Sequence, residues 1–309
     1  YRRSDFDGVA RTDAAGFTIG NKGYICGGYN GKTTRLADTW EYDIDNDWWT
    51  QRADMPGTVR NAATGFPVGN KGYITTGYNP DQKYLADTWE YDPETNTWRQ
   101  MDDFKGGARY YALGFGIDNY GYVGTGYNDN YLKDFYRFDP TAAAGSQWTI
   151  VNGFGGQKRQ GATAFVIDGK AYVCGGQNNS DVSDFWRFDP SAATPWTQLR
   201  DIANTSDDDY DDDYTSIVRS YGVSFVIDGK AYLTLGSTAG GSYYSNYWIY
   251  DPETDLWEGD DLTAFEGSTR IHAVCFSTGI RGIIATGGSG SSSYFDDTWE
   301  LKPYEYEEE

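Results

Sequence analysis

Six arginine residues recur along the chain at nearly regular intervals. They stand 49, 49, 50, 60 and 51 residues apart, at Arg11, Arg60, Arg109, Arg159, Arg219 and Arg270. A guanidinium group offers a planar set of N–H donors that suits carboxylates, phosphates and sugar hydroxyls. A period near 50 residues indicates a structural unit repeated six times. In a closed ring of such units, equivalent side chains point toward one place, so the six arginines would form one ligand-binding site.

The two residues that follow each arginine differ from unit to unit and could set what the site binds. They are Thr12-Asp13, Asn61-Ala62, Tyr110-Tyr111, Gln160-Gly161, Ser220-Tyr221 and Ile271-His272. We expect Tyr110, Tyr111, Tyr221 and His272 to cluster on one side of the opening and to contact a ligand. Aromatic faces beside hydrogen-bonding groups are typical of saccharide and peptide sites. Packing within the fold is the alternative for His272, the only histidine of the chain.

Each arginine also begins the same series of strands. Three positions later stands a small residue, at Ala14, Ala63, Ala112, Ala162, Gly222 and Ala273. Six positions later stands a phenylalanine, at Phe17, Phe66, Phe115, Phe165, Phe225 and Phe276. Such a strand suits a crowded position near a central axis. Turn sequences such as Asp168-Gly169 follow and predict a tight hairpin.

The second strand of this hairpin carries a tyrosine in the first five units and ends in a pair that contains glycine. The tyrosines are Tyr24, Tyr73, Tyr122, Tyr172 and Tyr232. The pairs are Gly27-Gly28, Thr76-Gly77, Thr125-Gly126, Gly175-Gly176, Leu235-Gly236 and Gly287-Gly288. In the sixth unit we expect one extra residue in the hairpin.

Two further strands complete each unit. The third carries Trp40, Trp89, Tyr136, Trp186, Trp248 or Trp299, and the fourth carries Trp49, Trp98, Trp148, Trp196 or Trp257. A turn such as Asp92-Pro93 joins them, and it fits a type I turn. Four antiparallel strands form a sheet with two faces to bury, and six such sheets can bury them by packing radially. The Tyr and Trp side chains then pack between sheets. The chain is therefore predicted to be one all-β domain.

The glycine pairs, the tyrosine four residues before them and the spaced tryptophan of the fourth strand resemble the kelch repeat over nearly the whole chain. The resemblance implies a six-bladed β-propeller with blades near residues 11–54, 60–102, 109–151, 159–200, 219–259 and 270–302. It also implies that the loops before the first strands and after the glycine pairs form a binding face around the channel mouth. The latter loops carry Asn30, Asn79, Asn128 and Asn178, with Ser237 and Ser289 in the last two units.

The sixth unit lacks a fourth strand, and the N-terminus is predicted to supply it. Residues 4–11 align with residues 102–109, which form the end of a fourth strand and the loop that follows it. We therefore expect residues 1 to about 5 to be the outer strand of the last blade, which closes the ring. The acidic tail, residues 304–309, is then surplus and exposed to solvent.

The arginines have an alternative role to ligand binding. Each could pair with an aspartate of the third strand, among Asp38, Asp87, Asp134, Asp184 and Asp297. Such a pair would be structural. A second acidic feature is the run from Asp207 to Tyr214 in the longest connection between blades. Asp207, Asp208 and Asp209 are weak candidates for Ca²⁺ ligands, but a solvated, mobile loop is the preferred interpretation.

The composition excludes several functional classes. A net charge of −21 repels phosphate backbones, so we expect no nucleic-acid partner. No apolar run is long enough to span a membrane. Metal-ligand spacings of Cys and His are absent, so no cofactor is expected. One histidine cannot build the copper site of galactose oxidase, a member of the kelch family.

We therefore expect a monomeric, non-catalytic binding domain that presents its channel mouth to a glycan or peptide. Six-bladed kelch proteins also include a sialic acid mutarotase, so an enzyme acting on an acidic sugar is the alternative. The negative charge and short polar loops resemble secreted, periplasmic or cell-surface bacterial members.

Overall fold

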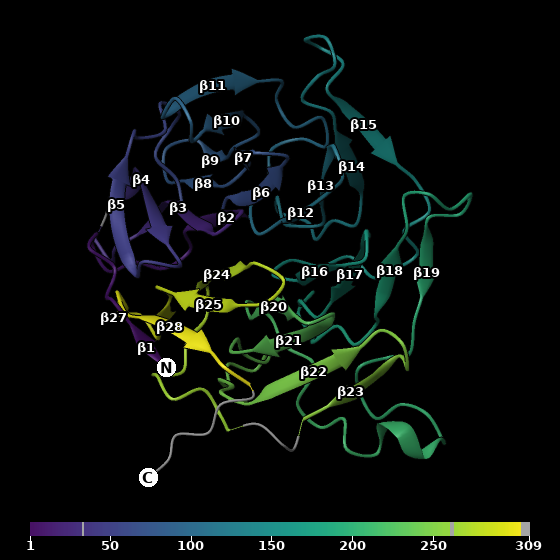
Figure 1. The fold of residues 1–309 in the computed structure, drawn as a ribbon. Helices are drawn as coiled ribbons and strands as arrows, with labels where there is room; N and C mark the ends of the chain where they lie inside the picture. The colour runs from purple at the N-terminus through teal and green to yellow at the C-terminus, as the bar shows by residue number, and fades with distance from the viewer. Residues whose placement is uncertain (33, 260–262, 304–309) are drawn as a thin grey trace.

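The chain folds into a closed ring of six four-stranded antiparallel sheets, which we call blades 1–6 (Figure 1). The computed structural model describes residues 1–32, 34–259 and 263–303. The acidic tail 304–309 lies outside this range. The innermost strands of neighbouring blades contact one another around the whole circle, including the first and last blades. The predicted six-bladed β-propeller is confirmed.

Each blade runs from an innermost to an outermost strand. Blade 1 consists of β2 (Ala15–Ile19), β3 (Lys22–Tyr29), β4 (Arg35–Asp43) and β5 (Trp48–Arg52). Blade 2 consists of β6 (Thr64–Val68), β7 (Lys71–Thr75), β10 (Thr88–Asp92) and β11 (Thr97–Met101). Blade 3 consists of β12 (Leu113–Ile117), β13 (Tyr120–Gly124), β14 (Phe135–Phe138) and β15 (Trp148–Val151).

The other three blades repeat this order. Blade 4 consists of β16 (Thr163–Ile167), β17 (Lys170–Cys174), β18 (Trp186–Phe188) and β19 (Trp196–Gln198). Blade 5 consists of β20 (Val223–Ile227), β21 (Lys230–Thr234), β22 (Tyr247–Asp251) and β23 (Leu256–Glu258). Blade 6 consists of β24 (Val274–Ser277), β25 (Gly282–Ala285), β28 (Thr298–Leu301) and the N-terminal β1 (Arg2–Arg3).

Short elements lie in the loops. Two small ladders, β8 (Tyr78–Asn79) with β9 (Lys83–Tyr84) and β26 (Gly288–Ser289) with β27 (Ser293–Tyr294), follow the second strands of blades 2 and 6. The only helical segment among the described residues is the 3₁₀-helix η1 (Asp209–Asp211). No helix in that part of the chain is therefore long and apolar enough to cross a bilayer.

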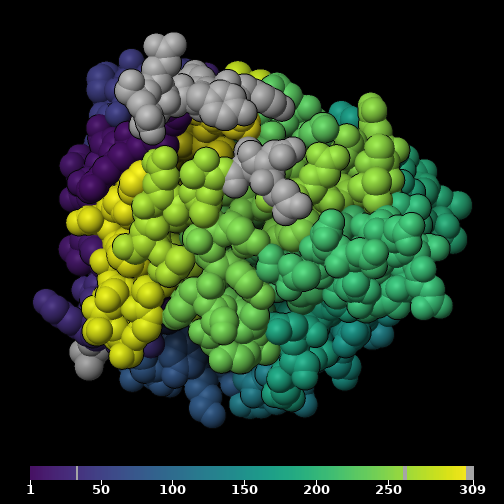
Figure 2. Space-filling model, turned by 90° about the horizontal axis from the view of Figure 1, so that it is seen from below, coloured from purple at the N-terminus to yellow at the C-terminus, as the bar shows by residue number. Residues whose placement is uncertain are grey.

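The N-terminal strand closes the ring as the sequence predicts. Arg2 pairs with Trp299 and Arg3 with Thr298 in an antiparallel register. Figure 2 shows the purple N-terminal residues lying against the yellow C-terminal strand. Phe6 is buried, and its ring lies 4.9 Å from the guanidinium carbon of Arg11. Phe104 makes the same contact with Arg109, also at 4.9 Å, so the two aligned segments have the same structure.

The core consists of clusters that fill the spaces between adjacent blades. Phe17 of β2 stacks on Tyr24 of β3, and both join Ile74 and Tyr91 of blade 2 in one cluster. A Cβ atom at Gly72 of blade 2 would lie 2.0 Å from the Phe17 ring, so only glycine fits there. The predicted packing of the Tyr and Trp side chains between blades is thus confirmed.

The sixth hairpin differs from its prediction. Phe276 pairs with Ile283 seven residues later, as Phe17 pairs with Tyr24, so no residue is inserted. The pair after this hairpin is Thr286-Gly287, one residue earlier than predicted. The first member of every pair has positive φ, and Thr76, Thr125, Leu235 and Thr286 adopt this conformation without being glycine. The second member is always glycine, because a Cβ there would collide: at Gly28 it would lie 2.8 Å from the Thr12 carbonyl oxygen.

Candidate functional site

The six arginines form a buried layer and do not line the mouth. Their exposed fractions are 0–1%. Arg60 shows the common arrangement: Nη1 and Nη2 donate to the two carboxylate oxygens of Asp87 at 2.7 and 2.6 Å, Nε donates to the carbonyl of Thr58, and Nη1 also to that of Thr76. Each guanidinium thus joins the loop before the first strand, the end of the second strand and the start of the third.

The predicted pairing with third-strand aspartates is confirmed in five blades. The pairs are Arg11–Asp38, Arg60–Asp87, Arg109–Asp134, Arg159–Asp184 and Arg270–Asp297. Burial by itself raises the pKa of Asp87, but hydrogen bonds and charge from Arg60 and a hydrogen bond from Trp89 outweigh it, and the pKa falls below its usual value. This arginine layer is buried and holds the blade together, so its guanidinium groups do not face a ligand at the mouth.

Blade 5 departs from the rule because Asn246 replaces the aspartate. Nη2 of Arg219 donates to Asn246 Oδ1 at 3.1 Å and to the carbonyl of Ser216 at 2.5 Å. The Tyr244 ring lies 4.7 Å from the guanidinium carbon. Burial without a carboxylate lowers the pKa of Arg219 to about 10.

Two residues after each arginine, the backbone forms a closed ring of hydrogen bonds around the axis. All six residues at this position have positive φ, from 52° at Tyr111 to 65° at Gly161: Asp13, Ala62, Tyr111, Gly161, Tyr221 and His272. The N–H of each donates to the carbonyl of its equivalent in the neighbouring blade, at 2.9–3.2 Å. We call this set the axial ring. It fixes the six side-chain positions nearest the axis.

Four axial-ring side chains gather over the channel and line a cavity of about 140 Å³. Nδ1 of His272 lies 2.9 Å from Oδ1 of Asp13, and the Tyr111 hydroxyl donates to the same oxygen at 2.7 Å. The Tyr111 ring stacks on His272 with centroids 5.0 Å apart. Tyr221 packs against both rings, and two amides, Nε2 of Gln160 and of Gln177, donate to its hydroxyl.

This axial cluster combines a carboxylate with an imidazole. Burial by itself raises the pKa of Asp13, but the charge and hydrogen bond of His272 and the hydrogen bond of Tyr111 outweigh it and lower the pKa overall. Burial raises the pKa of the Tyr111 hydroxyl well above its usual value. Asp13 therefore stays ionised and Tyr111 stays protonated near neutral pH. No other described residue bonds Nε2 of His272, whose side chain is 14% exposed.

One residue after each arginine, a second regular feature lies at the mouth, where some of its side chains are partly exposed and others, such as Asn61 and Ser220, are buried. This residue pairs with the residue after the glycine pair through two main-chain hydrogen bonds of 2.8–3.1 Å. The six bridge pairs are Thr12–Tyr29, Asn61–Tyr78, Tyr110–Tyr127, Gln160–Gln177, Ser220–Ser237 and Ile271–Gly288. The backbone is thus the same in all blades, whereas the side chains change from aromatic to amide to hydroxyl.

The four bridge-pair tyrosines, together with Tyr294 and Tyr131, form an arc of partly exposed rings across blades 6, 1, 2 and 3, in which Arg35 links Tyr29 to Tyr78. Tyr294 contacts Tyr29, and the guanidinium carbon of Arg35 lies 4.1 Å from the Tyr29 centroid and 5.6 Å from that of Tyr78. Tyr78 contacts Tyr110, Tyr110 contacts Tyr127, and Tyr127 contacts Tyr131 at centroid distances of 5.7, 5.7 and 5.1 Å. We call these six tyrosines the aromatic arc.

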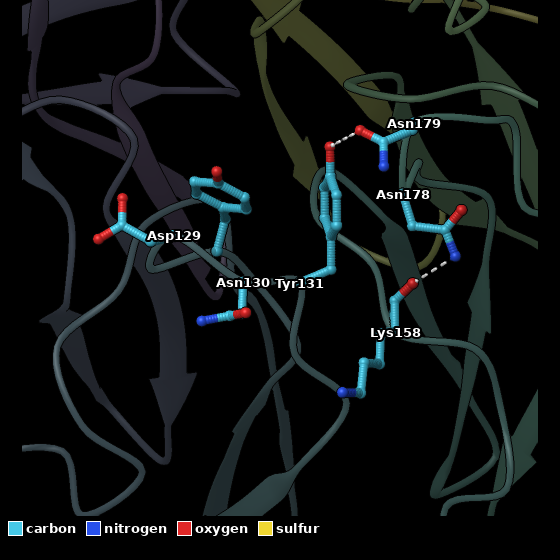
Figure 3. A pocket seen from close by; sticks show the side chains of 7 residues that line it. Asp129, Asn130, Tyr131, Lys158, Asn178 and Asn179 are labelled. Carbon is cyan, nitrogen blue, oxygen red and sulfur yellow. Dashed lines mark hydrogen bonds between the residues drawn. The ribbon is translucent and has the colours of Figure 1, made fainter.

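The arc ends in a groove of about 520 Å³ between the loops of blades 3 and 4 (Figure 3). Its walls are Tyr127, Asp129, Asn130 and Tyr131 from blade 3 and Lys158, Asn178 and Asn179 from blade 4. The two loops have the same fold, since the N–H of Asn128 donates to Asn130 and that of Asn178 to Ser180. We call this cavity the blade 3–4 groove.

The predicted asparagines differ in their surroundings. Oδ1 of Asn30 accepts the N–H of Lys32, and the buried Asn79 holds its own loop and donates to the carbonyl of Val59. Asn128 is partly exposed beside the blade 3–4 groove, and Asn178 lines it. Ser237 is buried in its bridge pair, and Ser289 lies in β26.

The structure brings the four predicted variable residues close together. Tyr111, Tyr221 and His272 share the axial cavity, and Tyr110 packs on Tyr111 with centroids 4.8 Å apart. They come from blades 3, 5 and 6, and Asp13 of blade 1 joins Tyr111, Tyr221 and His272 in the same cavity. Sequence reasoning missed Asp13 as a site residue, although it stands in register with Tyr111 and His272. It also missed Tyr131 and Lys158, for which no repeated signal exists.

The acidic run is more ordered than the sequence suggested. Asp211 is fully buried, and its carboxylate accepts the N–H groups of Thr205 and Ser206 and the Ser206 hydroxyl. Tyr214 is also buried and accepts the N–H of Trp257. The expectation of a solvated, mobile loop is therefore wrong for these two residues. Across residues 1–32, 34–259 and 263–303, no group of three or more His, Cys, Asp or Glu side chains is arranged to hold a metal ion.

Comparisons with known proteins agree with the ring architecture. Residues 18–207 match the family model described as the KLHDC2/KLHL20/DRC7 Kelch-repeats domain. A solved structure described as "Structure of YjhT" superimposes with a TM-score of 0.76 at 15% identity, covering 96% of this chain and 95% of that one. At this identity the likeness concerns the fold alone. No curated protein sequence matches the chain significantly.

Proposed function

The chain belongs to the Kelch-repeat family, and we propose that its mouth face binds a glycan or peptide without catalysing a reaction. The observation that carries this proposal is the aromatic arc. Partly exposed tyrosines continue across several blades and end beside the amides of blade 4. Tyrosine supplies a large contact area at low entropic cost together with a hydroxyl for hydrogen bonding.

The frame beneath this face favours a preorganised site. The main-chain hydrogen bonds of the bridge pairs and the axial ring fix the loops before a ligand arrives. A rigid surface loses little conformational entropy on binding. The arc is also wide enough to contact an extended ligand through several rings rather than one.

A binding screen with separate glycan and peptide arrays tests the proposal. Tyr110 lies at the centre of the arc, so Tyr110→Ala should weaken binding about tenfold or more. Trp48→Ala is the matched control, because Trp48 is an exposed aromatic residue of β5, outside the bridge pairs. An equal loss of affinity in both variants, or an affinity that neither substitution changes, would contradict a role for the mouth face.

A second candidate function is proton-transfer catalysis of the mutarotase kind on an acidic sugar, and the Asp13–His272 contact favours it. Asp13 orients the imidazole through Nδ1, which leaves Nε2 toward the cavity to take the proton of a sugar hydroxyl. The buried arginine layer offers no guanidinium for the sugar carboxylate, and the partly exposed Arg35 of the mouth face packs on Tyr29 and Tyr78, so this candidate ranks second. Exchange NMR on sialic acid anomers tests it: catalysis requires faster exchange that His272→Gln abolishes while binding persists.

A further inference from the structure

We propose that the blade 3–4 groove is the subsite for a neutral sugar unit, which stacks on Tyr131 and bonds its hydroxyls to the polar walls. This inference rests on the proposed function, because it specifies one part of the mouth face and one of the two ligand classes. It names a chemical class for the groove: an uncharged hexose or N-acetylhexosamine rather than a peptide or an anion.

The aromatic floor of the groove is held in place from two sides. The Tyr131 ring meets the edge of Tyr127, and its hydroxyl donates to Oδ1 of Asn179 at 3.1 Å. Figure 3 shows Tyr131 standing between the Asp129–Asn130 side and the Lys158–Asn178–Asn179 side. A fixed ring flanked by polar groups suits a sugar, whose ring has apolar C–H faces and a hydroxylated edge.

Donors and acceptors lie on opposite walls. On the blade 4 wall, the bond from Tyr131 engages Oδ1 of Asn179 and leaves its Nδ2 as a donor. The Lys158 ammonium on the same wall makes no ion pair with any residue that the structure describes. On the blade 3 wall, the Tyr84 hydroxyl donates to Oδ1 of Asp129, and no described residue bonds Oδ2. Sugar hydroxyls can donate to the carboxylate and accept from the amide and the ammonium in one pose.

The lining and the charge of the groove favour a neutral sugar over a peptide or an anion. A peptide side chain that anchors in a groove needs an apolar pocket. Among the described residues that line this groove, only Tyr127, Tyr131 and the aliphatic part of Lys158 offer apolar surface. An anionic sugar would meet the Asp129 carboxylate and the field of a chain with net charge −21. A neutral saccharide therefore fits best.

The test uses the full chain and a panel of methyl glycosides of glucose, galactose, mannose and N-acetylglucosamine, with methyl glucuronide and an unrelated tetrapeptide as probes of other classes. Saturation-transfer NMR and titration calorimetry measure binding. We expect at least one neutral glycoside to bind and Tyr131→Ala to weaken it about tenfold or more. Tyr131→Phe, which keeps the ring, should lose less than about threefold, and Lys158→Ala should fall between the two.

Tyr243→Ala is the matched control. Tyr243 occupies the same bridge position in blade 5 as Tyr131 does in blade 3, away from the groove. Unchanged melting curves show that the variants fold. The inference is overturned if only the glucuronide or the peptide binds, or if Tyr131→Ala and Tyr243→Ala behave alike. If Tyr110→Ala still abolishes binding in that case, the proposed function of the mouth face stands without this subsite; if nothing in either array binds, both proposals fail.

Discussion

The arginine layer and the bridge pairs lie next to each other in the chain, yet only the arginine layer keeps the same side chain in every blade. Arg60 is buried, donates four hydrogen bonds and has an arginine equivalent in every blade, whereas its neighbour Asn61, which is also buried, belongs to a pair whose side chains change from blade to blade. The comparison teaches that a repeated residue in a propeller marks the frame. The residues that vary within a repeated backbone are those that can recognise a ligand.

The N-terminal segment allows the strongest test of the frame. Deleting residues 1–8 removes β1, the buried Phe6 and the ring contact on Arg11, while the mouth face keeps all its side chains. Loss of a buried phenylalanine alone costs about 3–5 kcal/mol. We expect the melting temperature to fall by about 10 °C or more, measured by calorimetry. Arg2→Ala, on the same strand but exposed, should change little, and an unchanged melting curve for the deletion would refute the closure.

One substitution in the arginine layer and one in the aromatic arc compare the two regions directly. Arg60→Ala leaves the Asp87 carboxylate without its cation, and breaking a buried pair costs about 3–5 kcal/mol. Tyr110→Ala on the arc should cost less than about 1.5 kcal/mol because the ring is partly exposed. Urea unfolding of both variants measures the difference. Equal losses of stability would mean that the arc also belongs to the frame.

The pH dependence of stability tests the arginine–aspartate pairs and has the smallest expected effect. The pKa values of Asp38, Asp87 and Asp297 lie below their usual range, because their arginine partners outweigh the effect of burial. The stability from these pairs is therefore complete above the unfolded-state pKa of about 3.9 and is lost as the pH falls through the folded-state values. Asp87→Asn removes one such group, so its stability deficit relative to the wild type should shrink below about pH 4. A deficit that stays constant on acidification would contradict the assignment.

The repeated features were predictable from the sequence because their positions keep the same residue type in all or nearly all blades. The spacing of the arginines and the phenylalanines located all six blades, and the aspartates of the third strands gave the arginine partners. The misplaced sixth pair shows the limit. Thr286 adopts a positive φ that glycine usually supplies, so the sequence indicates the doublet Gly287-Gly288 where the structure has Thr286-Gly287.

The candidate site was predictable only in part, for a physical reason. Alignment of the repeats placed Tyr111, Tyr221 and His272 at equivalent positions, but it could not show that Asp13 meets them across the axis. The blade 3–4 groove depends on Tyr131 and Lys158, which belong to different blades and to different loops. A contact between two repeats leaves no trace in the pattern of either one.

The hydrogen bonds that join each bridge pair run between main-chain atoms, so its partly exposed side chains, such as Tyr29, Tyr110 and Gln177, are not needed to hold the pair together. Exchanging them blade by blade would alter what the surface recognises without inserting residues or remodelling a loop. The molecule thus offers a ready scaffold for combinatorial libraries, in which neighbouring blades can be diversified separately and then combined.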